Sequence, residues 1–251
     1  MSIERGLDLL EYMAATNASH TLEHLSEHLG IPRTSCFRVL KVLQARGYVQ
    51  IAEASGPQKW ELTYKLSAFG NMVEKDGNLR AAALPLMKEL AQVTDLFVQL
   101  GVVSNNKVLY IEDVQRPKLL QVYAPKWSYL EIHACAAGLV LLSHMSKNQV
   151  EEIIRQEGMP RKTNSTITDL DELHAVLGEV KKQNYAIDKE YYAPGITCVA
   201  APIFNYQGVC LAAVGVTGST DEFSDLPVII REVQECAFGV SARLGYENGA
   251  V

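Results

Sequence analysis

The chain has 251 residues, 48% of them hydrophobic, and a formal net charge of −6 at pH 7. The apolar fraction excludes a disordered chain, and the acidic balance excludes a protein that coats nucleic acid with its whole surface. No apolar run reaches the roughly 18 residues of a membrane-spanning helix, and the first residues lack the apolar segment of a signal peptide. We therefore expect a cytoplasmic protein whose five cysteines are reduced thiols.

Charge is distributed unevenly along the chain. Residues 1–70 hold seven of the 23 basic and seven of the 29 acidic residues, so the acidic excess lies entirely in residues 71–251. This asymmetry indicates a small neutral domain and a larger acidic domain with different roles.

Three helices are predicted in the first part of the chain. Apolar residues at helical spacing indicate a helix over 3–14, and a second one that begins after its N-cap Thr21 and stops at Gly30. A third helix, over 31–46, has Pro32 as its first helical residue. This helix is amphipathic and contains four basic residues and no acidic one. A helix and a turn followed by a basic helix are typical of DNA recognition in the major groove.

Two short strands follow, over 48–51 and 59–63, around the turn residues 54–57. Three helices and a hairpin predict a winged helix-turn-helix; a winged helix that binds another protein is the alternative. Hydroxyls at the start of the basic helix and cations along it can contact phosphates or guanine edges. The expected DNA-binding residues are Thr21, Arg33, Thr34, Ser35, Phe37, Arg38, Lys41 and Lys59.

Residues 24–28 match His-x-x-Glu-His, a short pattern found in some zinc peptidases. Helical spacing puts His24 and His28 on one face, but the helix is short and no third ligand is evident. We interpret both as surface histidines near the DNA, and we expect neither a metal nor a cofactor.

The connector, residues 67–93, shows helical periodicity interrupted at 76–78 and bent near Pro85. It reads as a linker helix followed by a helix that enters the next domain. Exposed apolar faces on such a linker favour dimerisation, and a dimer presents two recognition helices to two half-sites.

The remaining chain, residues 94–251, alternates strand-like and helical segments, which indicates an α+β domain with a mostly antiparallel sheet. Asn105 and Asn106 mark a hairpin turn between its first two strands. We predict strands at 96–103, 107–112, 119–123, 185–188, 196–204 and 209–217, and helices at 132–145, 147–157, 169–183 and 224–245.

A helix start rich in small residues, Ala136 to Gly138, is the main candidate site in this domain. Bare backbone N–H groups there can hold an anion, although close packing of the helix on the sheet is the favoured explanation of the small residues taken by themselves. A second hypothesis is a thiol-based redox sensor or an enzyme that uses Cys198 or Cys135 with His133. Cys198 lies within a strand of small apolar residues, where a buried inert thiol is the usual outcome.

Five blocks of the chain resemble, in order and spacing, the IclR-type family of bacterial transcriptional regulators, named after the isocitrate lyase regulator. The resemblance covers nearly the whole sequence and rests on residues 5–11, 25–35, 43–49, 133–138 and 195–204. It implies a winged helix-turn-helix domain over 1–66, the connector, and a GAF-like effector-binding domain over 94–251. It also implies a regulator, not an enzyme, that binds operator DNA as a homodimer or homotetramer and senses a small organic acid.

By the same resemblance, the effector pocket is formed by Leu119, Trp127, Ala136, Ala137, Asp188, Ile196, Cys198, Gly215 and Thr217. The family often has two serines where this chain has Gly215 and Thr217, so we expect a pocket that has lost one hydroxyl and gained space. Leu139 replaces the family's lysine. Tyr123 and Tyr129, with Trp127, can enclose a bulkier or partly apolar ligand; a place in the core or in a dimer interface is the alternative, and the favoured one, for at least one of them.

Overall fold

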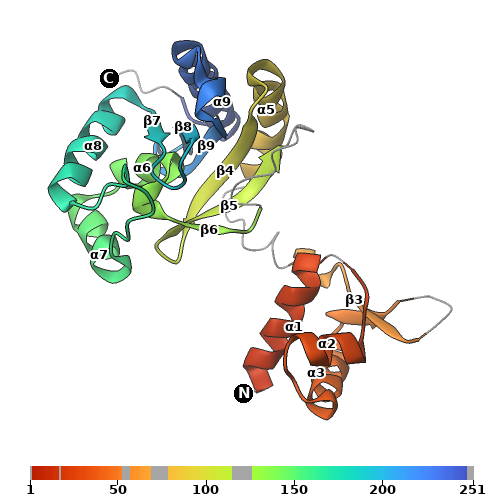
Figure 1. Ribbon diagram of the computed structural model, residues 1–251. Helices are drawn as coiled ribbons and strands as arrows, with labels where there is room; N and C mark the ends of the chain where they lie inside the picture. The colour runs from red at the N-terminus through yellow and green to blue at the C-terminus, as the bar shows by residue number, and fades with distance from the viewer. Residues whose placement is uncertain (1, 17, 53–56, 69–78, 115–125, 248–251) are drawn as a thin grey trace. The chain divides into compact units, whose positions relative to one another are not determined.

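The structure is a computed structural model, and it describes residues 2–16, 18–52, 57–68, 79–114 and 126–247. The chain divides into two compact units, residues 1–75 and 76–251 (Figure 1). Each unit has its own hydrophobic core and is described by itself.

The N-terminal unit is a winged helix-turn-helix. Its helices and strands are α1 (Ser2–Thr16), β1 (His20–Thr21), α2 (Leu22–His28), α3 (Arg33–Ala45), β2 (Val49–Ile51) and β3 (Lys59–Leu62). The three strands form an antiparallel sheet in the order β1-β3-β2. Its core gathers apolar residues from every helix around the fully buried Trp60 of β3.

Local sequence signals set the ends of these helices. The Thr21 hydroxyl accepts a hydrogen bond from the backbone N–H of His24 and so caps α2, as predicted. Gly30 takes the left-handed backbone conformation, with φ of 62°, that turns the chain toward α3. Pro32 is the N-cap of α3, not its first helical residue, because its ψ of 132° is extended. The short strand β1 was not predicted; it is held by pairing with β3.

The described part of the C-terminal unit contains six strands and the helices that cover them. In chain order it has α5 (Leu79–Thr94), β4 (Phe97–Ser104), β5 (Lys107–Val114), β6 (Tyr129–Glu131), the 3-10 turn η1 (Ile132–Ala134), α6 (Ala136–Ser143), α7 (Lys147–Glu157), α8 (Leu170–Gln183), β7 (Ala186–Lys189), β8 (Ile196–Phe204), β9 (Cys210–Ser219), the 3-10 turn η2 (Thr220–Phe223) and α9 (Leu226–Arg243). The described strands are all antiparallel, in the order β6-β5-β4-β9-β8-β7.

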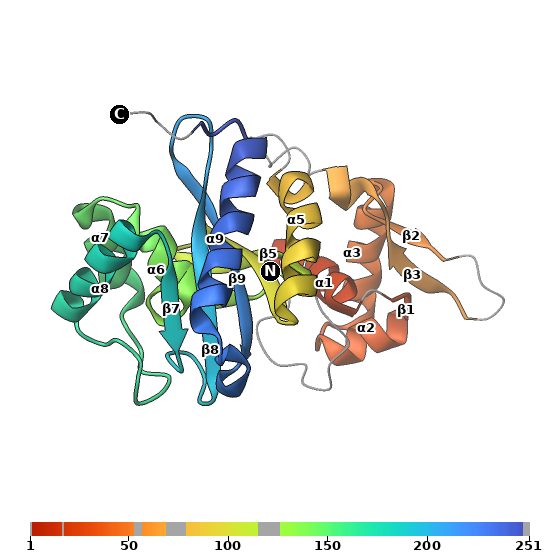
Figure 2. The same ribbon diagram turned by 90° about the horizontal axis from the view of Figure 1, so that it is seen from above.

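The sheet separates two helical layers, which Figure 2 shows on either side of it. Helices α5 and α9 pack on one face through a core that includes Met87, Val98, Val214 and Val233. Helices α6, α7 and α8 cover the other face, and α6 is buried along its whole length. A helix that is apolar on all sides fits this position, between the sheet and α8.

The structure differs from the sequence prediction at two places in this unit. The helix predicted over 132–145 is divided, because residues 132–134 form a 3-10 turn and α6 begins only at Ala136. Helix α5 continues through Pro85, and the bend expected there stays a prediction. The edge strand β6 was missed, since only three residues of it pair with β5. The predicted strand 119–123 lies outside the described residues.

The predicted fold class is confirmed: an α+β chain with a winged helix-turn-helix and a separate domain built on an antiparallel sheet. The domain bounds 1–66, 67–93 and 94–251 stay a prediction, and α5, the described part of the connector, packs within the second unit. Within the part of the chain that the structure describes, no helix is both long enough and apolar enough to cross a lipid bilayer.

Candidate DNA-reading helix and effector cavity

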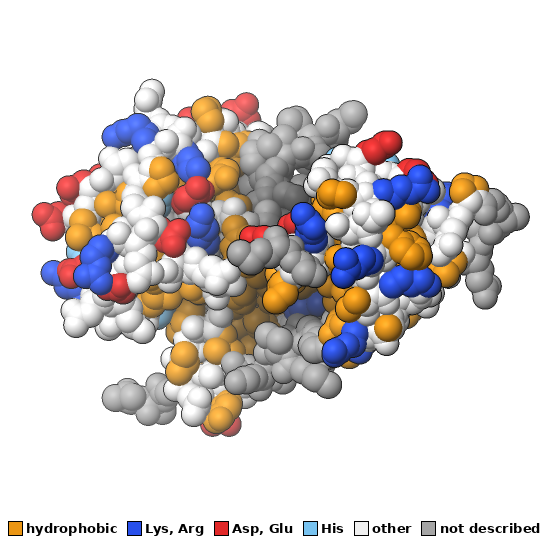
Figure 3. Space-filling model, turned by 90° about the horizontal axis from the view of Figure 1, so that it is seen from below, with side chains coloured by type: hydrophobic (Ala, Val, Ile, Leu, Met, Phe, Trp, Pro, Cys, Tyr) orange, Lys and Arg blue, Asp and Glu red, His pale blue; other side chains and the backbone are white. Residues whose placement is uncertain are grey.

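Helix α3 buries one face and exposes a basic one. Cys36 and Leu40 are fully buried in the core of the N-terminal unit. The side chains at 33, 34, 37, 38 and 41 are exposed, and Ser35 is half-buried. Helical spacing therefore places most of the predicted DNA-binding residues on one accessible surface. Figure 3 shows Lys and Arg side chains gathered among apolar ones on one face of this unit.

The contacts of these cations differ. Arg33 forms an ion pair with Glu23 of α2, which ties the start of α3 to the first helix of the motif. Lys41 donates a hydrogen bond to Gln44 and lies 5.8 Å from the ring centroid of Phe37. An Arg33 side chain that is already paired must exchange its partner to reach DNA.

Histidines form a separate cluster beside α1. The rings of His20 and His24 stack with centroids 4.9 Å apart, and Tyr12 stacks on His28 at 4.3 Å. The Tyr12 hydroxyl and the His24 Nε2 atom are hydrogen-bonded at 2.8 Å. Among the residues that the structure describes, no three His, Cys, Asp or Glu side chains are grouped to hold a metal ion.

A small cavity lies in the C-terminal unit between the start of α6 and the middle of the sheet. Its empty volume is about 210 Å³, part of which is open to solvent. Its walls come from strands β4, β5, β8 and β9 and the first residues of α6. The lining residues are Gln99, Tyr110, Ala136, Ala137, Cys198, Val199, Ala200, Gly215, Val216 and Thr217.

The first residues of α6 form one wall of this cavity. Cys135 is the N-cap, and the first backbone hydrogen bond of the helix runs from the N–H of Leu139 to the carbonyl of Cys135. The N–H groups of Ala136 and Ala137 precede that bond, at the positive end of the helix dipole. The small-residue helix start therefore lies at the cavity, and anion binding there stays a prediction.

The polar lining groups are linked to one another. The Thr217 hydroxyl lies 3.2 Å from the Gln99 amide oxygen and 3.3 Å from the Cys198 sulfur. Asp188 pairs with Cys198 across β7 and β8, is 1% exposed, and accepts a hydrogen bond of 2.6 Å from the backbone N–H of Tyr191. Burial raises the pKa of Asp188 to about 7, although the hydrogen bonds from Tyr191 and Cys198 act in the opposite direction.

Five of the nine predicted effector residues line the cavity: Ala136, Ala137, Cys198, Gly215 and Thr217. Asp188 is buried behind Cys198, and Ile196 is buried two residues before it on β8. Leu119 and Tyr123 lie outside the described residues.

The sequence prediction missed Gln99 and Tyr110, which face the cavity from neighbouring strands. Both residues lie on predicted strands, where alternate side chains point to the same face of the sheet. That alternation does not show which of the two faces meets α6.

Two of the expected pocket residues have other surroundings than expected in this structure. Trp127 does not line the cavity; it is 58% exposed, with Arg80 and Lys126 lying 5.7 and 5.9 Å from its ring centroid. Gly215 does not enlarge the pocket, because a Cβ atom there would lie 2.5 Å from the backbone oxygen of Val199. The missing side chain lets β8 and β9 approach each other, so the space it would occupy is already filled.

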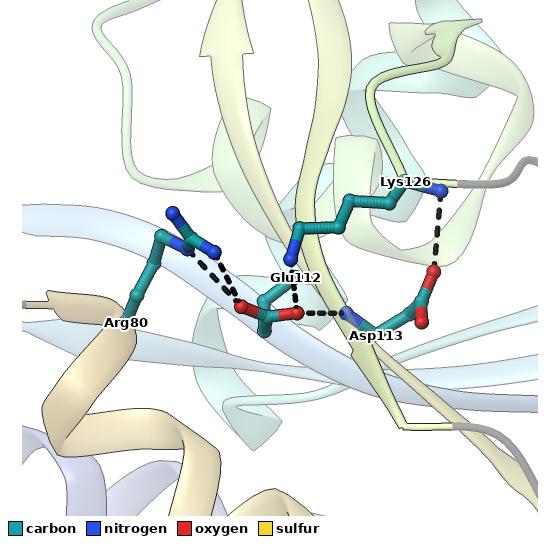
Figure 4. A network of polar contacts seen from close by, with 4 residues as sticks. All are labelled: Arg80, Glu112, Asp113 and Lys126. Atoms are coloured by element: carbon teal, nitrogen blue, oxygen red, sulfur yellow. Dashed lines mark hydrogen bonds and ion pairs between the residues drawn. The ribbon is translucent and has the colours of Figure 1, made fainter. Parts of the chain in front are cut away.

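An ion network beside the cavity joins α5 to the strands (Figure 4). The buried Glu112 carboxylate of β5 accepts hydrogen bonds from Arg80 at 2.7 and 3.1 Å and from Lys126 at 2.6 Å. Burial opposes ionisation of Glu112, but these cations and the backbone N–H of Asp113 outweigh it and hold its pKa below the usual value. The backbone N–H of Trp127 donates to the Tyr110 carbonyl at 2.7 Å, which places this network next to the cavity wall.

The thiol hypothesis is not supported. Burial raises the pKa of Cys135 to about 12 and that of Cys198 well above the usual value, so neither is a ready thiolate. His133 is 1% exposed, and its Nε2 atom pairs with the Pro160 carbonyl at 3.3 Å rather than with a thiol.

Known proteins share both units. The family model for the C-terminal part of the bacterial transcriptional regulator IclR matches residues 72–242, and the IclR helix-turn-helix domain matches residues 2–51. The chain is 28% identical to the HTH-type transcriptional regulator BhcR of Paracoccus denitrificans, over 96% of this chain and 88% of that protein. It is 29% identical to the transcriptional repressor IclR of Escherichia coli, over 89% of this chain and 82% of that protein.

Among solved structures, an IclR homologue from Microbacterium hydrocarbonoxydans, complexed with 4-hydroxybenzoate, has the same fold. The TM-score is 0.81 at 23% identity, over 97% of this chain and 99% of that one. A helix-turn-helix unit with an exposed basic helix, followed by a domain with a cavity between its sheet and α6, defines a ligand-responsive transcriptional regulator. The chain belongs to the IclR family of bacterial transcriptional regulators. Its relatives are regulators rather than enzymes.

Proposed function

We propose that this regulator binds operator DNA through α3, and that its affinity for the DNA changes when a small carboxylic acid occupies the cavity beside α6. The observation that carries the proposal is the cavity in which the first residues of α6 meet buried polar side chains of the sheet. A carboxylate is the group that backbone N–H groups at a helix start favour.

Arg38 is the residue of α3 for which we expect the clearest effect on DNA binding. It is exposed on the helix, in the stretch without acidic residues. Arg38→Ala should weaken binding by about 1–3 kcal/mol and relax sequence preference if the side chain contacts a base edge. The measurement is a fluorescence-anisotropy titration on duplexes that the wild-type protein selects from a random pool, at several salt concentrations.

Arg155→Ala, which removes the same charge from an exposed helix of the other unit, is the matched control and should leave DNA affinity unchanged. If Arg38→Ala retains both the wild-type affinity and the wild-type salt slope, Arg38 has no part in DNA binding.

The effector role is tested by a thermal-shift screen of sugar acids, aromatic acids including 4-hydroxybenzoate, and short carboxylates. An acid at a hundredfold its dissociation constant stabilises the protein by about 2.7 kcal/mol, which corresponds to a rise in Tm of roughly 5–10 °C. Thr217→Val removes a hydroxyl that lies in the cavity wall, and should reduce the rise. Thr220→Val removes a hydroxyl just beyond the same strand, which pairs with Thr197 and does not line the cavity, and should not.

The same acid should change the affinity for the selected duplexes, because a ligand that favours one geometry of the chain shifts DNA binding reciprocally. A screen in which no acid stabilises the wild-type protein would refute the carboxylate assignment.

We further propose that the functional unit is a homodimer or a homotetramer, because two copies of α3 can read two half-sites. The exposed apolar side chains Ile3 and Leu7 of α1, 80% and 53% exposed, support an association that covers them. Light scattering of the purified protein gives the oligomeric state directly.

A further inference from the structure

The cavity wall has no positive side chain among the residues that the structure describes. Its polar groups are a tyrosine and a threonine hydroxyl, an amide and a thiol, on Tyr110, Thr217, Gln99 and Cys198. A bound carboxylate therefore relies on the partial charge of the α6 N–H groups, which is about half an elementary charge.

Asp188 brings a second acid to this region. Its carboxyl is 1% exposed, and it meets the cavity through Cys198, its hydrogen-bonded partner on β8. The ionisable groups that face it are Tyr110 from β5, Cys135 from the start of α6, and Tyr191, which follows β7. On the side of α8, Glu172 acts on Tyr191 and is also acidic.

None of these described neighbours of Asp188 is a cation, so nothing there compensates a negative charge on Asp188. Burial already raises the pKa of its carboxyl to about 7. An anionic ligand in the adjoining cavity disfavours ionisation further, since like charges repel strongly where water is excluded.

We propose, building on the effector role proposed above, that the cavity takes up a monocarboxylate together with one proton from solvent, which Asp188 holds while the acid is bound. The balance is simple: the ionised Asp188 carboxylate, one proton and one carboxylate anion give the protonated Asp188 beside the bound anion. A dicarboxylate binds more weakly, because its second negative charge meets no cation in the described wall.

The pH dependence has a definite sign. Below about pH 6, Asp188 is already protonated in the free protein, and affinity does not vary with pH. Above about pH 7, a growing fraction of the free protein must gain a proton on binding, so affinity falls by up to about tenfold per pH unit. Between pH 5.5 and 8.5 the expected loss is about 10- to 30-fold.

Isothermal titration calorimetry on the full chain tests this with acetate, lactate, benzoate and 4-hydroxybenzoate as monocarboxylates, and succinate and terephthalate as dicarboxylates. Titrations at pH 8.5 in two buffers of different ionisation enthalpy count the protons, and we expect close to one taken up per acid bound. At pH 5.5 we expect none.

Asp188→Asn keeps the size of the side chain and an oxygen that can accept from Tyr191, but it cannot ionise. Its affinity for the best monocarboxylate should be flat from pH 5.5 to 8.5. Asp171→Asn removes an exposed acid from α8 and should keep the wild-type pH profile. If Asp188→Asn does not fold, the proton count of the wild-type protein still decides.

The outcomes separate this proposal from the one it builds on. Binding of a monocarboxylate with no pH dependence and no proton uptake overturns the proton linkage and leaves the effector role intact. A dicarboxylate that binds as tightly as its monocarboxylate counterpart overturns the charge selectivity. If no acid of the panel binds the wild-type protein at any pH, the carboxylate effector itself is refuted.

Discussion

Replacing Gly138 with Ala should destabilise the effector-binding unit by about 3 kcal/mol or more, the largest effect we expect from a single methyl group. A Cβ atom at this position would lie 1.9 Å from the carbonyl oxygen of Ile132 and 2.6 Å from its carbonyl carbon. Both atoms are backbone of the turn η1, so no side-chain rotation relieves the clash. Either η1 or α6 must move, and with α6 move the N–H groups of Ala136 and Ala137.

Urea unfolding followed by far-ultraviolet circular dichroism measures this effect, and the thermal-shift response to acids reports on the cavity. Gly178→Ala is the matched control, because Gly178 lies in α8 with no atom within 4 Å of its would-be Cβ. That change should stabilise the unit by roughly 0.5–1 kcal/mol, the usual gain for Gly to Ala within an exposed helix. Equal urea midpoints for Gly138→Ala and wild type would show that η1 moves to accommodate the methyl group without loss of stability.

Removing the carboxylate of Glu112 should cost the effector-binding unit about 2 kcal/mol or more. The side chain is 10% exposed and is the shared partner of Arg80 and Lys126, which are 36% and 29% exposed. Glu112→Ala leaves two partly buried cations without their counter-charge, and breaking a buried ion pair from one side costs about 3–5 kcal/mol when water cannot reach it. Because both cations are partly exposed to water, we expect a smaller loss of stability here.

Fluorescence of Trp127 gives a local readout, since it is the only tryptophan besides Trp60 and lies against both cations. A Trp60→Phe background isolates its signal during urea unfolding. The difference in unfolding free energy between Glu112→Ala and its parent should decrease as the pH is lowered. A carboxyl whose folded-state pKa is depressed stabilises above its unfolded pKa, about 4.3, and that stabilisation is lost as pH falls through the folded pKa.

Glu152→Ala removes an exposed carboxylate that pairs with Arg155 on α7, and we expect no change in the midpoint. A Glu112→Ala protein with the wild-type midpoint at neutral pH would mean that water replaces the carboxylate without loss.

Much of the fold was predictable from local patterns. The ends of α7 and β8 match the predicted ranges, because a helix cap and a run of strand-forming residues are encoded within a few positions. The hairpin at Asn105 and Asn106 was predictable too, because asparagine tolerates the positive φ that such turns require. Both residues adopt it in the structure. The strand β1 was not, since two residues become a strand only by pairing with β3.

The candidate site divided in the same way. The small residues at 136–138 and the aspartate and cysteine opposite each other on β7 and β8 were identified from the sequence and its family resemblance. Tyr110 and Gln99 were missed, because their place in the cavity depends on which face of β4 and β5 meets α6. Trp127 was assigned to the pocket from its position in the chain, yet the backbone turns it toward Arg80 and Lys126.

By itself the sequence determined the helix-turn-helix, the basic surface of α3 and membership of a family of regulators, since these follow from spacing along a helix and from matching blocks. Tertiary structure alone decided that Gly138 and Gly215 are places of backbone contact, and that Asp188 is buried beside the cavity without a cation in its described surroundings. The physical reason is that burial and like-charge proximity depend on strands and helices distant in sequence, and these set both the space in the cavity and the protonation of its acid.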